Sequence, residues 1–269
     1  MSKPTLVIDA GMGNWSLFFS PLAEELKKFS KVCLINRTGY VGPHSGATAK
    51  DGFSIARQMK KVLEQQGISE QIILVGHSLG GLHIRCFQHL FPGQVAGMVL
   101  LDAAHPSLLE LMPQVKANLE QQIRMVRVIT VLAWAGLLRF AKSSIPTFGL
   151  PPALHGSYYE VTTRARYYRT YGSEMQNFES NLALGKTLGS LGDLPLLIIS
   201  SPYGLNKPLA ENSSTEMKED TLWMSLQEDF ARLSSRSRFV KSTGDHFLHL
   251  TDTGFVAGAI REFYCDIQD

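Results

Sequence analysis

The sequence predicts an α/β protein, built on a mostly parallel open sheet of about six strands with helices on both faces, plus a helical cap insertion. Short apolar segments alternate along the chain with amphipathic helix candidates, an order typical of parallel α/β folds. Most apolar segments are hydrophobic throughout rather than at alternate residues, as expected for strands that helices cover on both sides. One interval of about 90 residues interrupts the alternation and carries only helical periodicity.

Six apolar segments are predicted to be the strands of this sheet. They are Thr5–Asp9, Val32–Asn36, Ile72–Val75, Gly97–Asp102, Leu196–Ser200 and Ser237–Lys241. Helices are predicted at Pro21–Phe29, Asp51–Gln66, Leu82–Leu90, Leu222–Leu233 and Phe255–Phe263. The first helix starts at a proline, and the second starts at an aspartate and ends before Gly67, which are common helix-terminal signals. Residues 201–221 are polar and rich in glycine and proline, so they predict a long loop.

The interval between the fourth and fifth predicted strands is the candidate cap. Apolar residues recur at helical spacing over Leu108–Phe140 and again over Tyr158–Thr170, and a segment with prolines and a glycine separates them at 145–152. We therefore expect a core domain made of residues 1–105 and 195–269, and a helical cap made of residues 106–194.

Length and composition favour a soluble globular protein and argue against several other classes. The 269 residues are 44% hydrophobic and 19% charged, which provides enough apolar sequence for a sizeable core. The formal net charge of +2 is too small to indicate a nucleic-acid partner. The longest apolar stretch, Val128–Leu138, is too short to span a bilayer, so no membrane span is expected.

Cysteine usage and the first residues bear on the cellular compartment. Cys33, Cys86 and Cys265 are far apart, odd in number and without zinc-ligand spacing, so we expect free buried thiols in a reducing compartment. The first four residues lead directly into a predicted strand, which argues against a signal peptide. These observations favour a cytoplasmic protein and give no prediction of its oligomeric state.

The strongest chemical signal is residues 71–81, Gln-Ile-Ile-Leu-Val-Gly-His-Ser-Leu-Gly-Gly. An apolar run leads into a G-x-S-x-G pattern centred on Ser78, and a helix candidate follows, which is the context that a nucleophile elbow requires. A serine on so sharp a turn needs neighbours without side chains, and Gly76 and Gly80 supply them. The pattern therefore predicts Ser78 as a nucleophile. The alternative is an ordinary glycine-rich turn between a strand and a helix.

A serine nucleophile needs a base, because its hydroxyl is unreactive at neutral pH. His246 follows the last predicted strand, at the carboxyl end of the sheet, where ligand sites lie in open parallel sheets. His249 is the nearest competitor. His77 adjoins Ser78, but neighbouring side chains in a turn point apart, and His83 on the following helix is expected to be structural. We therefore predict His246 as the general base.

With these motifs in one chain, the sequence resembles the α/β-hydrolase superfamily, in particular bacterial serine hydrolases with a helical cap. The order of nucleophile, acid and histidine is that of the family. Further resemblance lies in Leu-Val-Ile-Asp-Ala-Gly-Met-Gly at 6–13, Asn-Arg-Thr-Gly-Tyr at 36–40, Leu-Leu-Asp-Ala-Ala-His-Pro at 100–106 and Asp-His-Phe-Leu-His-Leu at 245–250. Two features depart from the family. Ala10-Gly11 stands where a His-Gly pair is common, and the amino-terminal antiparallel strands are missing.

The resemblance implies an oxyanion hole made of two backbone N–H groups, which would stabilise the negative charge of the transition state. One belongs to the residue after the nucleophile, Leu79, and the other to Met12 in the loop after the first strand. A flexible turn is the alternative interpretation of that loop. A mechanism of this kind needs no metal ion and no organic cofactor.

The third member of the triad is predicted to be Asp102, with Glu211 as the alternative. The family places its acid in the loop after the strand that follows the elbow, or in the loop after the next strand. Asp102 lies at the first position, whereas the second position, which begins at Ser200, has no carboxylate before Glu211. Asp102 could instead cap the entry to the cap. Asp9, also at a strand end, is expected to fix its loop by accepting backbone hydrogen bonds.

The predicted function is hydrolysis of a carboxylic ester or related acyl bond in a small-molecule substrate. The same three residues could also serve a thioesterase, a peptidase, a carbon–carbon hydrolase or a cofactor-free haloperoxidase. A serine nucleophile argues against a haloalkane dehalogenase, which uses a carboxylate at this position. The alternative from another class is a non-catalytic ligand-binding or signalling protein on the same fold, since a fold does not determine a function.

The cap offers weak indications of the substrate. Core packing is the simplest explanation of its aromatic residues, and a substrate cage is the alternative. These residues are Trp134, Phe140, Phe148, Tyr158, Tyr159, Tyr167, Tyr168, Tyr171 and Phe178. Arg164, Arg166 and Arg169 leave an anionic substrate open, although a solvated helix face explains them more simply.

Overall fold

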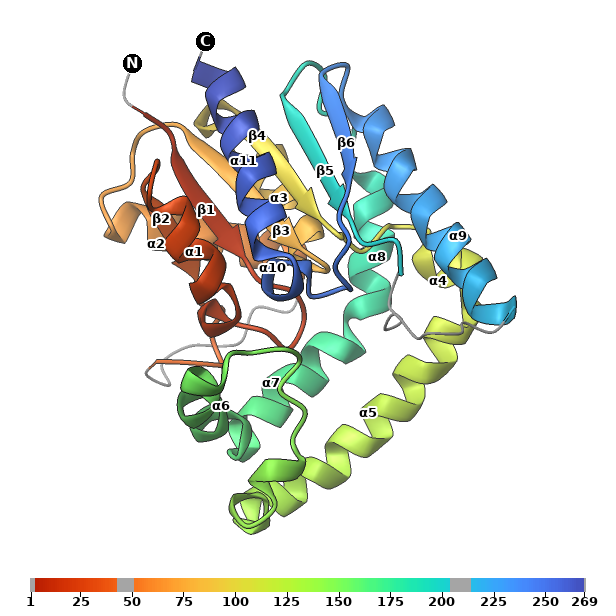
Figure 1. The fold of residues 1–269 in the computed structure, drawn as a ribbon. Helices are drawn as coiled ribbons and strands as arrows, with labels where there is room; N and C mark the ends of the chain where they lie inside the picture. The colour runs from red at the N-terminus through yellow and green to blue at the C-terminus, as the bar shows by residue number, and fades with distance from the viewer. Residues whose placement is uncertain (1–2, 43–50, 204–213, 269) are drawn as a thin grey trace.

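The computed structural model describes residues 3–42, 51–203 and 214–268, and it confirms the predicted fold class. Six strands form one sheet in the order β2-β1-β3-β4-β5-β6, and every adjacent pair is parallel (Figure 1). The strands are β1 (Thr5–Asp9), β2 (Val32–Ile35), β3 (Ile72–His77), β4 (Val95–Leu101), β5 (Leu196–Ser200) and β6 (Ser237–Lys241). Three of them have the predicted bounds, and the other three differ by one or two residues at one or both ends.

Helices cover both faces of the sheet, which explains why its central strands are apolar throughout (Figure 1). Alternate residues of β1 face opposite ways: Leu6 and Ile8 join one apolar cluster, and Val7 joins the other. The first cluster includes α1 (Ser20–Leu26) and α11 (Thr253–Gln268). The second includes α2 (Gly52–Gln65), α3 (Gly80–Leu90) and α9 (Ser214–Asp229). Each fully buried aliphatic side chain of this kind contributes roughly 1.5–3 kcal/mol.

Between β4 and β5 the chain forms five helices, most of which lie beyond the carboxyl ends of the strands (Figure 1). They are α4 (Leu108–Leu111), α5 (Pro113–Trp134), α6 (His155–Thr162), α7 (Ala165–Gln176) and α8 (Phe178–Thr187). This is the segment that the sequence predicts as a cap. Its division from the core domain at residues 106 and 194 stays a prediction. The site described below lies between these helices and the carboxyl edge of the sheet.

Each of the two segments with helical periodicity in the cap forms more than one helix. The segment Leu108–Phe140 becomes α4 and α5, because Pro113 has no N–H to continue the first helix and is favourable at the start of a new one. Gly136 then ends α5 with a left-handed φ of 76°. The segment Tyr158–Thr170 is divided by the extended backbone of Arg164.

Two other expectations are corrected. The predicted loop at 201–221 is too long, because α9 begins at Ser214; residues 204–213 lie outside the described residues. Of the thiols expected to be buried, Cys86 is buried, Cys33 is half-buried and Cys265 is exposed. Within the described ranges, no helix combines the length and apolarity needed to cross a membrane.

Short helices complete the described chain. These are α10 (Leu248–Thr251) and the 3-10 turns η1 (Ser16–Phe19), η2 (Pro92–Gln94), η3 (Leu137–Arg139), η4 (Lys142–Ser144), η5 (Pro152–Leu154) and η6 (Phe230–Leu233).

Candidate active site

Ser78 occupies a strained turn between β3 and α3. Its φ is 52°, in the left-handed region that residues with side chains seldom adopt. A side chain at either flanking glycine would collide with backbone: a Cβ on Gly76 would lie 2.5 Å from the carbonyl oxygen of Gly80, and a Cβ on Gly80 would lie 2.5 Å from that of Asp9. The sequence pattern thus corresponds to a turn that only glycine at these two positions permits.

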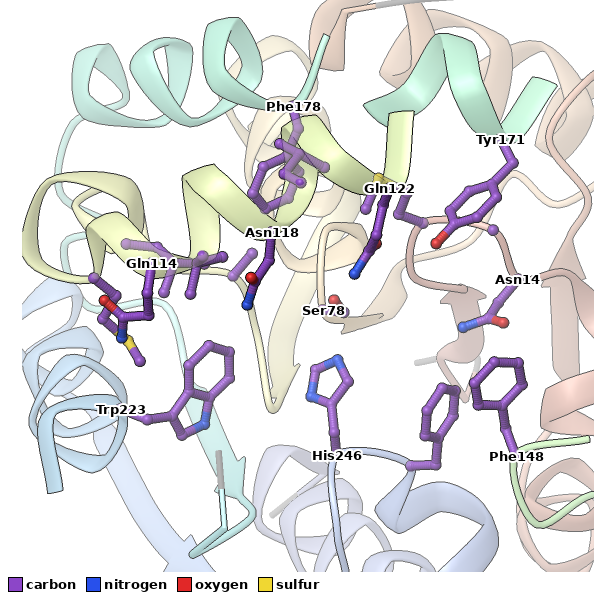
Figure 2. Close-up of a pocket in the computed structure, with 18 of the residues that line it drawn as sticks. Asn14, Ser78, Gln114, Asn118, Gln122, Phe148, Tyr171, Phe178, Trp223 and His246 are labelled. Atoms are coloured by element: carbon purple, nitrogen blue, oxygen red, sulfur yellow. The ribbon is translucent and has the colours of Figure 1, made fainter. Parts of the chain in front are cut away.

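Asp102 and His246 are joined by a hydrogen bond of 2.6 Å from His246 Nδ1–H to Asp102 Oδ2. Asp102 directly follows β4, which pairs with the strand that precedes Ser78, so both residues lie at the same edge of the sheet. The Ser78 N–H donates to the carbonyl oxygen of Leu101, 3.1 Å away. Figure 2 shows the His246 ring pointing toward Ser78. With Nδ1 committed to Asp102, the Nε2 atom of His246 is left as the acceptor for a serine proton.

The buried carboxylate of Asp102 is held by three further donors, all on its Oδ1 atom. Ser200 Oγ–H lies 3.0 Å away, the Ser201 N–H 2.9 Å and Trp223 Nε1–H 2.9 Å. Four hydrogen bonds offset the cost of burying a carboxylate that has no exposed surface. Ser200 and Ser201 occupy the second position considered for the acid, and they supply donors to Asp102 instead. Glu211, the alternative acid, lies outside the described residues.

Two histidines that lie next to His246 have lowered pKa values. Burial lowers the pKa of His249 to about 3 and lowers the pKa of His77 well below the usual value, with adjacent histidines adding to both shifts. The His249 ring stacks on Phe19 with centroids 4.1 Å apart. A base with so low a pKa is inefficient at neutral pH, which argues against His249 as the general base. His77 Nε2–H donates to the His246 carbonyl oxygen at 2.8 Å and thereby supports the loop of that residue.

The loop after β1 is held by Arg37, which lies two residues after the end of β2. The Arg37 guanidinium donates to the Asp9 carboxylate at 2.9 Å and to the carbonyl oxygens of Ala10 and Gly11. Asp9 also accepts from His83 Nδ1–H at 2.6 Å, so its partners are side chains and not the backbone donors expected from the sequence. Burial opposes the charge of Asp9, but Arg37 and His83 outweigh it and lower the pKa of the carboxyl group.

Glu174 of α7 joins the cap to this same loop. Its Oε1 accepts from Arg37 Nε–H at 2.8 Å, and its Oε2 accepts from the Gly13 N–H at 3.0 Å and from the Tyr40 hydroxyl at 2.6 Å. Burial and the Glu174 charge raise the pKa of Tyr40 well above its usual value, so its hydroxyl stays a donor. Sequence reasoning missed these contacts, since Glu174 lies 137 residues from Arg37 and has no motif around it.

The loop passes close to the elbow and carries an unused donor. A Cβ on Gly11 would lie 2.8 Å from Ser78 Cβ, so the backbone approaches the serine directly. Within the described ranges, the N–H groups of Met12 and Leu79 make no hydrogen bond, whereas the neighbouring Gly13 N–H is occupied by Glu174 and Tyr40. Met12 and Leu79 therefore remain the predicted oxyanion donors.

Ser78 and His246 face a cavity of about 390 Å³ between the sheet edge and the cap helices (Figure 2). Four of the cap aromatics line it, while two others point to the exterior: Trp134 is 79% exposed and Phe140 is 90% exposed. The four that line it are Phe148, Tyr167, Tyr171 and Phe178. The aromatic residues of the cap thus serve several purposes, and those lining the cavity give it apolar walls.

One side of the cavity carries a row of amide side chains. Gln114, Asn118 and Gln122 are spaced four residues apart on α5, so they repeat about every 6 Å along one helix face. Figure 2 shows them directed into the cavity above His246. Within the described part of the chain, none of the three amides has a hydrogen-bond partner, so their donors and acceptors are available to a ligand.

The charges around the cavity do not suit an anion. Among the described residues that line it there is no lysine or arginine, and the carboxylates Glu219 and Asp220 lie on the α9 side. Of the arginines considered for an anionic substrate, Arg166 is engaged elsewhere: it donates to the carbonyl oxygens of Gly39 and Gly42, which links α7 to the loop after β2. Across the described ranges, no three His, Cys, Asp or Glu side chains are arranged to hold a metal ion.

Comparison with known proteins agrees with this architecture. A family model for the α/β hydrolase fold matches residues 4–131. An esterase from Thermogutta terrifontis has a TM-score of 0.68 at 17% identity, with 100% of this chain and 92% of that chain covered. Epoxide hydrolase CorEH gives a TM-score of 0.70 at 12% identity, covering 99% of this chain and 93% of that chain. A Nostoc sp. PCC 7120 protein described as a "putative alpha/beta hydrolase" gives a TM-score of 0.75 at 14% identity, covering 97% of this chain and 90% of that chain.

Fold and site together define an open parallel α/β sheet with a serine elbow at its carboxyl edge. The family-model match over residues 4–131 and the fold shared with solved α/β hydrolases confirm the resemblance seen in the sequence. At these identities the structural likeness establishes the fold alone.

One curated protein is also similar to part of the chain. It is the Hormonema carpetanum protein named "Probable transporter efuK", 28% identical over 107 residues, or 38% of this chain. The chain spans about 15% of the length of that protein, so no role in transport is carried over.

Proposed function

We propose that this protein is a serine hydrolase that cleaves a carboxylic ester or related acyl bond in an uncharged small molecule. The observation that carries the proposal is the 2.6 Å hydrogen bond between Asp102 and His246, beside a serine on a strained turn. A buried carboxylate that orients an imidazole next to a serine is the arrangement that makes a serine hydroxyl nucleophilic.

In the proposed reaction, Ser78 Oγ attacks the acyl carbon while its proton passes to His246 Nε2. The carbonyl electron pair moves onto the oxygen, where the N–H groups of Met12 and Leu79 would stabilise the negative charge. Collapse of this intermediate breaks the bond to the alcohol, which leaves with the proton from His246. Water then attacks the acyl-serine by the same route, so that the carboxylic acid is released and Ser78 is restored.

Asp102 contributes by fixing the imidazole and by stabilising the imidazolium that forms as Ser78 attacks. Because its Oδ1 atom already accepts three hydrogen bonds, only Oδ2 faces His246, and the ring keeps its proton on Nδ1. This supports Asp102 as the triad acid in preference to Glu211.

The cavity supports an uncharged substrate with polar groups. Its lining has no cation among the described residues, while the amide row on α5 offers neutral donors and acceptors opposite apolar aromatic walls. An acyl compound with hydroxyl, carbonyl or amide groups matches this combination better than a plain alkyl ester or an anionic ester does.

A fluorophosphonate probe tests the catalytic proposal against the non-catalytic alternative. We expect one label per chain on Ser78 in the folded wild type and none in Ser78→Ala, together with a loss of roughly 10³-fold or more in ester hydrolysis. A folded wild-type protein that takes no label and hydrolyses none of a panel of neutral esters would exclude the serine-hydrolase function.

A further inference from the structure

The far end of the cap carries a large apolar surface that no described part of the chain covers. We name this surface the cap tip and define it by the exposed apolar residues of the second half of α5 and the turn after it. These residues are Met125, Val128, Val131, Leu132, Trp134, Leu137 and Phe140. They are seven of the eleven exposed large hydrophobic side chains in the described chain, so exposed apolar surface is concentrated there.

The exposure of the individual side chains is high. Phe140 is 90% exposed, Trp134 is 79% exposed and Val131 is 62% exposed. On a helix, residues three and four positions apart are neighbours, so Val128, Val131 and Trp134 form one continuous strip on the outer face of α5. The inner face of this half of the helix is the side that packs, since Val126 and Ala133 are buried.

Four cations lie in the same segment of the chain as the cap tip, and that segment contains no carboxylate to balance them. Arg124, Arg127, Arg139 and Lys142 are all exposed, and across the described ranges none of the four has an ion-pair partner. The sequence contains no Asp or Glu between Glu120 and Glu160. Unpaired cations beside exposed aromatic and aliphatic side chains match a partner that has an apolar interior under a negatively charged surface, as an anionic lipid bilayer has.

The same charges argue against a second copy of the chain as the partner. A symmetric dimer through this face would bring the four cations of one copy against the four of the other, without a carboxylate in the segment. The position also suits a membrane surface, because the end of α5 is the part of the molecule farthest from the sheet (Figure 1). Trp134 and Phe140 can then enter the interface while the core domain stays outside.

We propose that the cap tip docks the protein onto the surface of an anionic lipid bilayer. The exposed apolar side chains enter the headgroup region, and the four cations contact lipid phosphates and carboxylates. Docking uses residues separate from Ser78 and His246, so it stands or falls independently of the hydrolase function. It is peripheral binding and needs no membrane-spanning helix.

Tryptophan fluorescence reports the docking directly. Of the three tryptophans, Trp15 is 3% exposed and Trp223 is 1% exposed. A change in tryptophan emission on contact with lipid therefore comes mainly from the exposed Trp134. Vesicles of phosphatidylcholine with 30% phosphatidylglycerol should shift the emission of the full chain to shorter wavelength, and pure phosphatidylcholine vesicles should not. The shift should weaken as salt is raised, because salt screens exposed charges, and it should be absent from Trp134→Phe.

Co-sedimentation with the same vesicles, with folding checked by circular dichroism, tests which residues bind. Arg124→Gln with Arg127→Gln should weaken binding roughly 25-fold, since each surface cation contributes about fivefold. The matched control is Arg57→Gln with Lys61→Gln, which removes two exposed cations one turn apart on α2 and should leave binding unchanged. Trp134→Ser with Phe140→Ser should lower binding, whereas Phe255→Ser, on α11, should not. Ser78→Ala should bind like the wild type.

Three results would overturn the proposal. One is the absence of wild-type binding to anionic vesicles at low salt. Another is equal loss of binding in the cap-tip variants and their controls, which would mean nonspecific attraction. The third is a wild-type dimer in analytical ultracentrifugation that the Trp134→Ser, Phe140→Ser variant converts to a monomer, which would assign the cap tip to self-association.

Discussion

The Glu174 carboxylate of cap helix α7 accepts a hydrogen bond of 3.0 Å from the backbone N–H of Gly13, in the loop that follows β1. This loop also carries Met12, the residue predicted to supply one oxyanion donor. The same carboxylate accepts from Arg37 and Tyr40, so the cap, the end of β2 and the loop converge on one buried group. With the Gly13 N–H occupied, the adjacent Met12 N–H is the donor left for a substrate.

Glu174→Gln should therefore impair catalysis as well as stability. A glutamine must turn its NH₂ group toward either Arg37 or the Gly13 and Tyr40 donors, so that two donors face each other. The buried Arg37 guanidinium also loses one of its two carboxylate partners. We expect a loss of about 3–5 kcal/mol in the free energy of unfolding. We also expect the folded fraction to lose kcat with little change in KM, because the loop would act on the transition state.

Denaturant unfolding and steady-state kinetics measure these two effects. Tyr40→Phe is the milder comparison, since it removes one hydrogen bond to Glu174 and keeps the charges. Its kcat should lie between those of the wild type and Glu174→Gln. A Glu174→Gln protein with wild-type kcat would show that the contact only supports stability.

Local sequence patterns predicted the elements of the site but not the contacts that hold them. The elbow around Ser78 could be recognised because the strand, turn and helix are contiguous and the glycines are required by close backbone approach. His246 and Asp102 could be proposed because both follow strands, and parallel strands end at the same edge. The cap shows the limit of arguments from periodicity. The helical spacing of apolar residues continues across Pro113 and Arg164, whereas the helices themselves end there.

The contacts between distant segments had no sequence signal of their own. Trp223 donates to Asp102 from 121 residues away, and it lies in a helix whose start was predicted as loop. The only sequence signal at Arg37 is its place in a family-like loop, and Glu174 is one of six acidic residues in the cap. The position of α7 over the loop brings these side chains together, and that position depends on tertiary packing.

Asp102→Asn should fold and yet lose most activity. The Oδ1 atom of Asp102 accepts three hydrogen bonds, so an asparagine will place its oxygen there and its NH₂ group toward His246. The His246 Nδ1 atom must then accept a hydrogen bond, which moves the ring proton to Nε2, where it cannot take the proton of Ser78.

The expected loss in kcat for Asp102→Asn is roughly 10⁴-fold, measured with a neutral ester. Trp223→Phe removes one of the donors to Oδ1 and leaves the bond from His246 to Oδ2 intact, so it should lose less than about tenfold. Near-wild-type turnover by Asp102→Asn would mean that another acid, such as Glu211, orients His246.

The buried neutral histidines should make the protein less stable in mild acid. The pKa of His249 is about 3 in the folded protein, where burial lowers it, and roughly 6.5 in the unfolded chain. Above pH 6.5 neither state binds the proton and there is no effect. As the pH falls below 6.5 the unfolded chain takes up a proton that the folded protein does not, so the free energy of unfolding decreases.

For His249 this decrease should reach about 3 kcal/mol at pH 4.5. Urea unfolding from pH 7.5 to 4.5 measures it. His249→Leu should flatten the dependence in part, with His77 accounting for a remainder of the same sign. His89→Leu is the matched control, because His89 is exposed. An equal slope in the wild type and His249→Leu would contradict the assignment of a neutral buried His249.

The amide row on α5 should determine substrate preference. Asn118 lies in the middle of the row, and its side chain is directed into the cavity that Ser78 and His246 face (Figure 2). Asn118→Leu removes its donors and acceptor and adds apolar surface. KM should therefore rise roughly 2–10-fold for neutral esters whose acyl part carries hydroxyl or amide groups, since one hydrogen bond is worth about 0.5–1.5 kcal/mol. For plain alkyl esters of the same length, KM should stay the same or fall.

Gln121→Leu provides the comparison on the same helix, because Gln121 is exposed and does not line the cavity. It makes the same kind of change in polarity and should leave both classes of ester unaffected. The informative quantity is the ratio of kcat/KM for a polar ester to that for its alkyl counterpart, which cancels any general loss of activity. A fall of this ratio in Asn118→Leu alone assigns the row to substrate recognition. An unchanged ratio in Asn118→Leu would mean that the substrate does not contact this face of α5, and recognition would then rest on the aromatic walls.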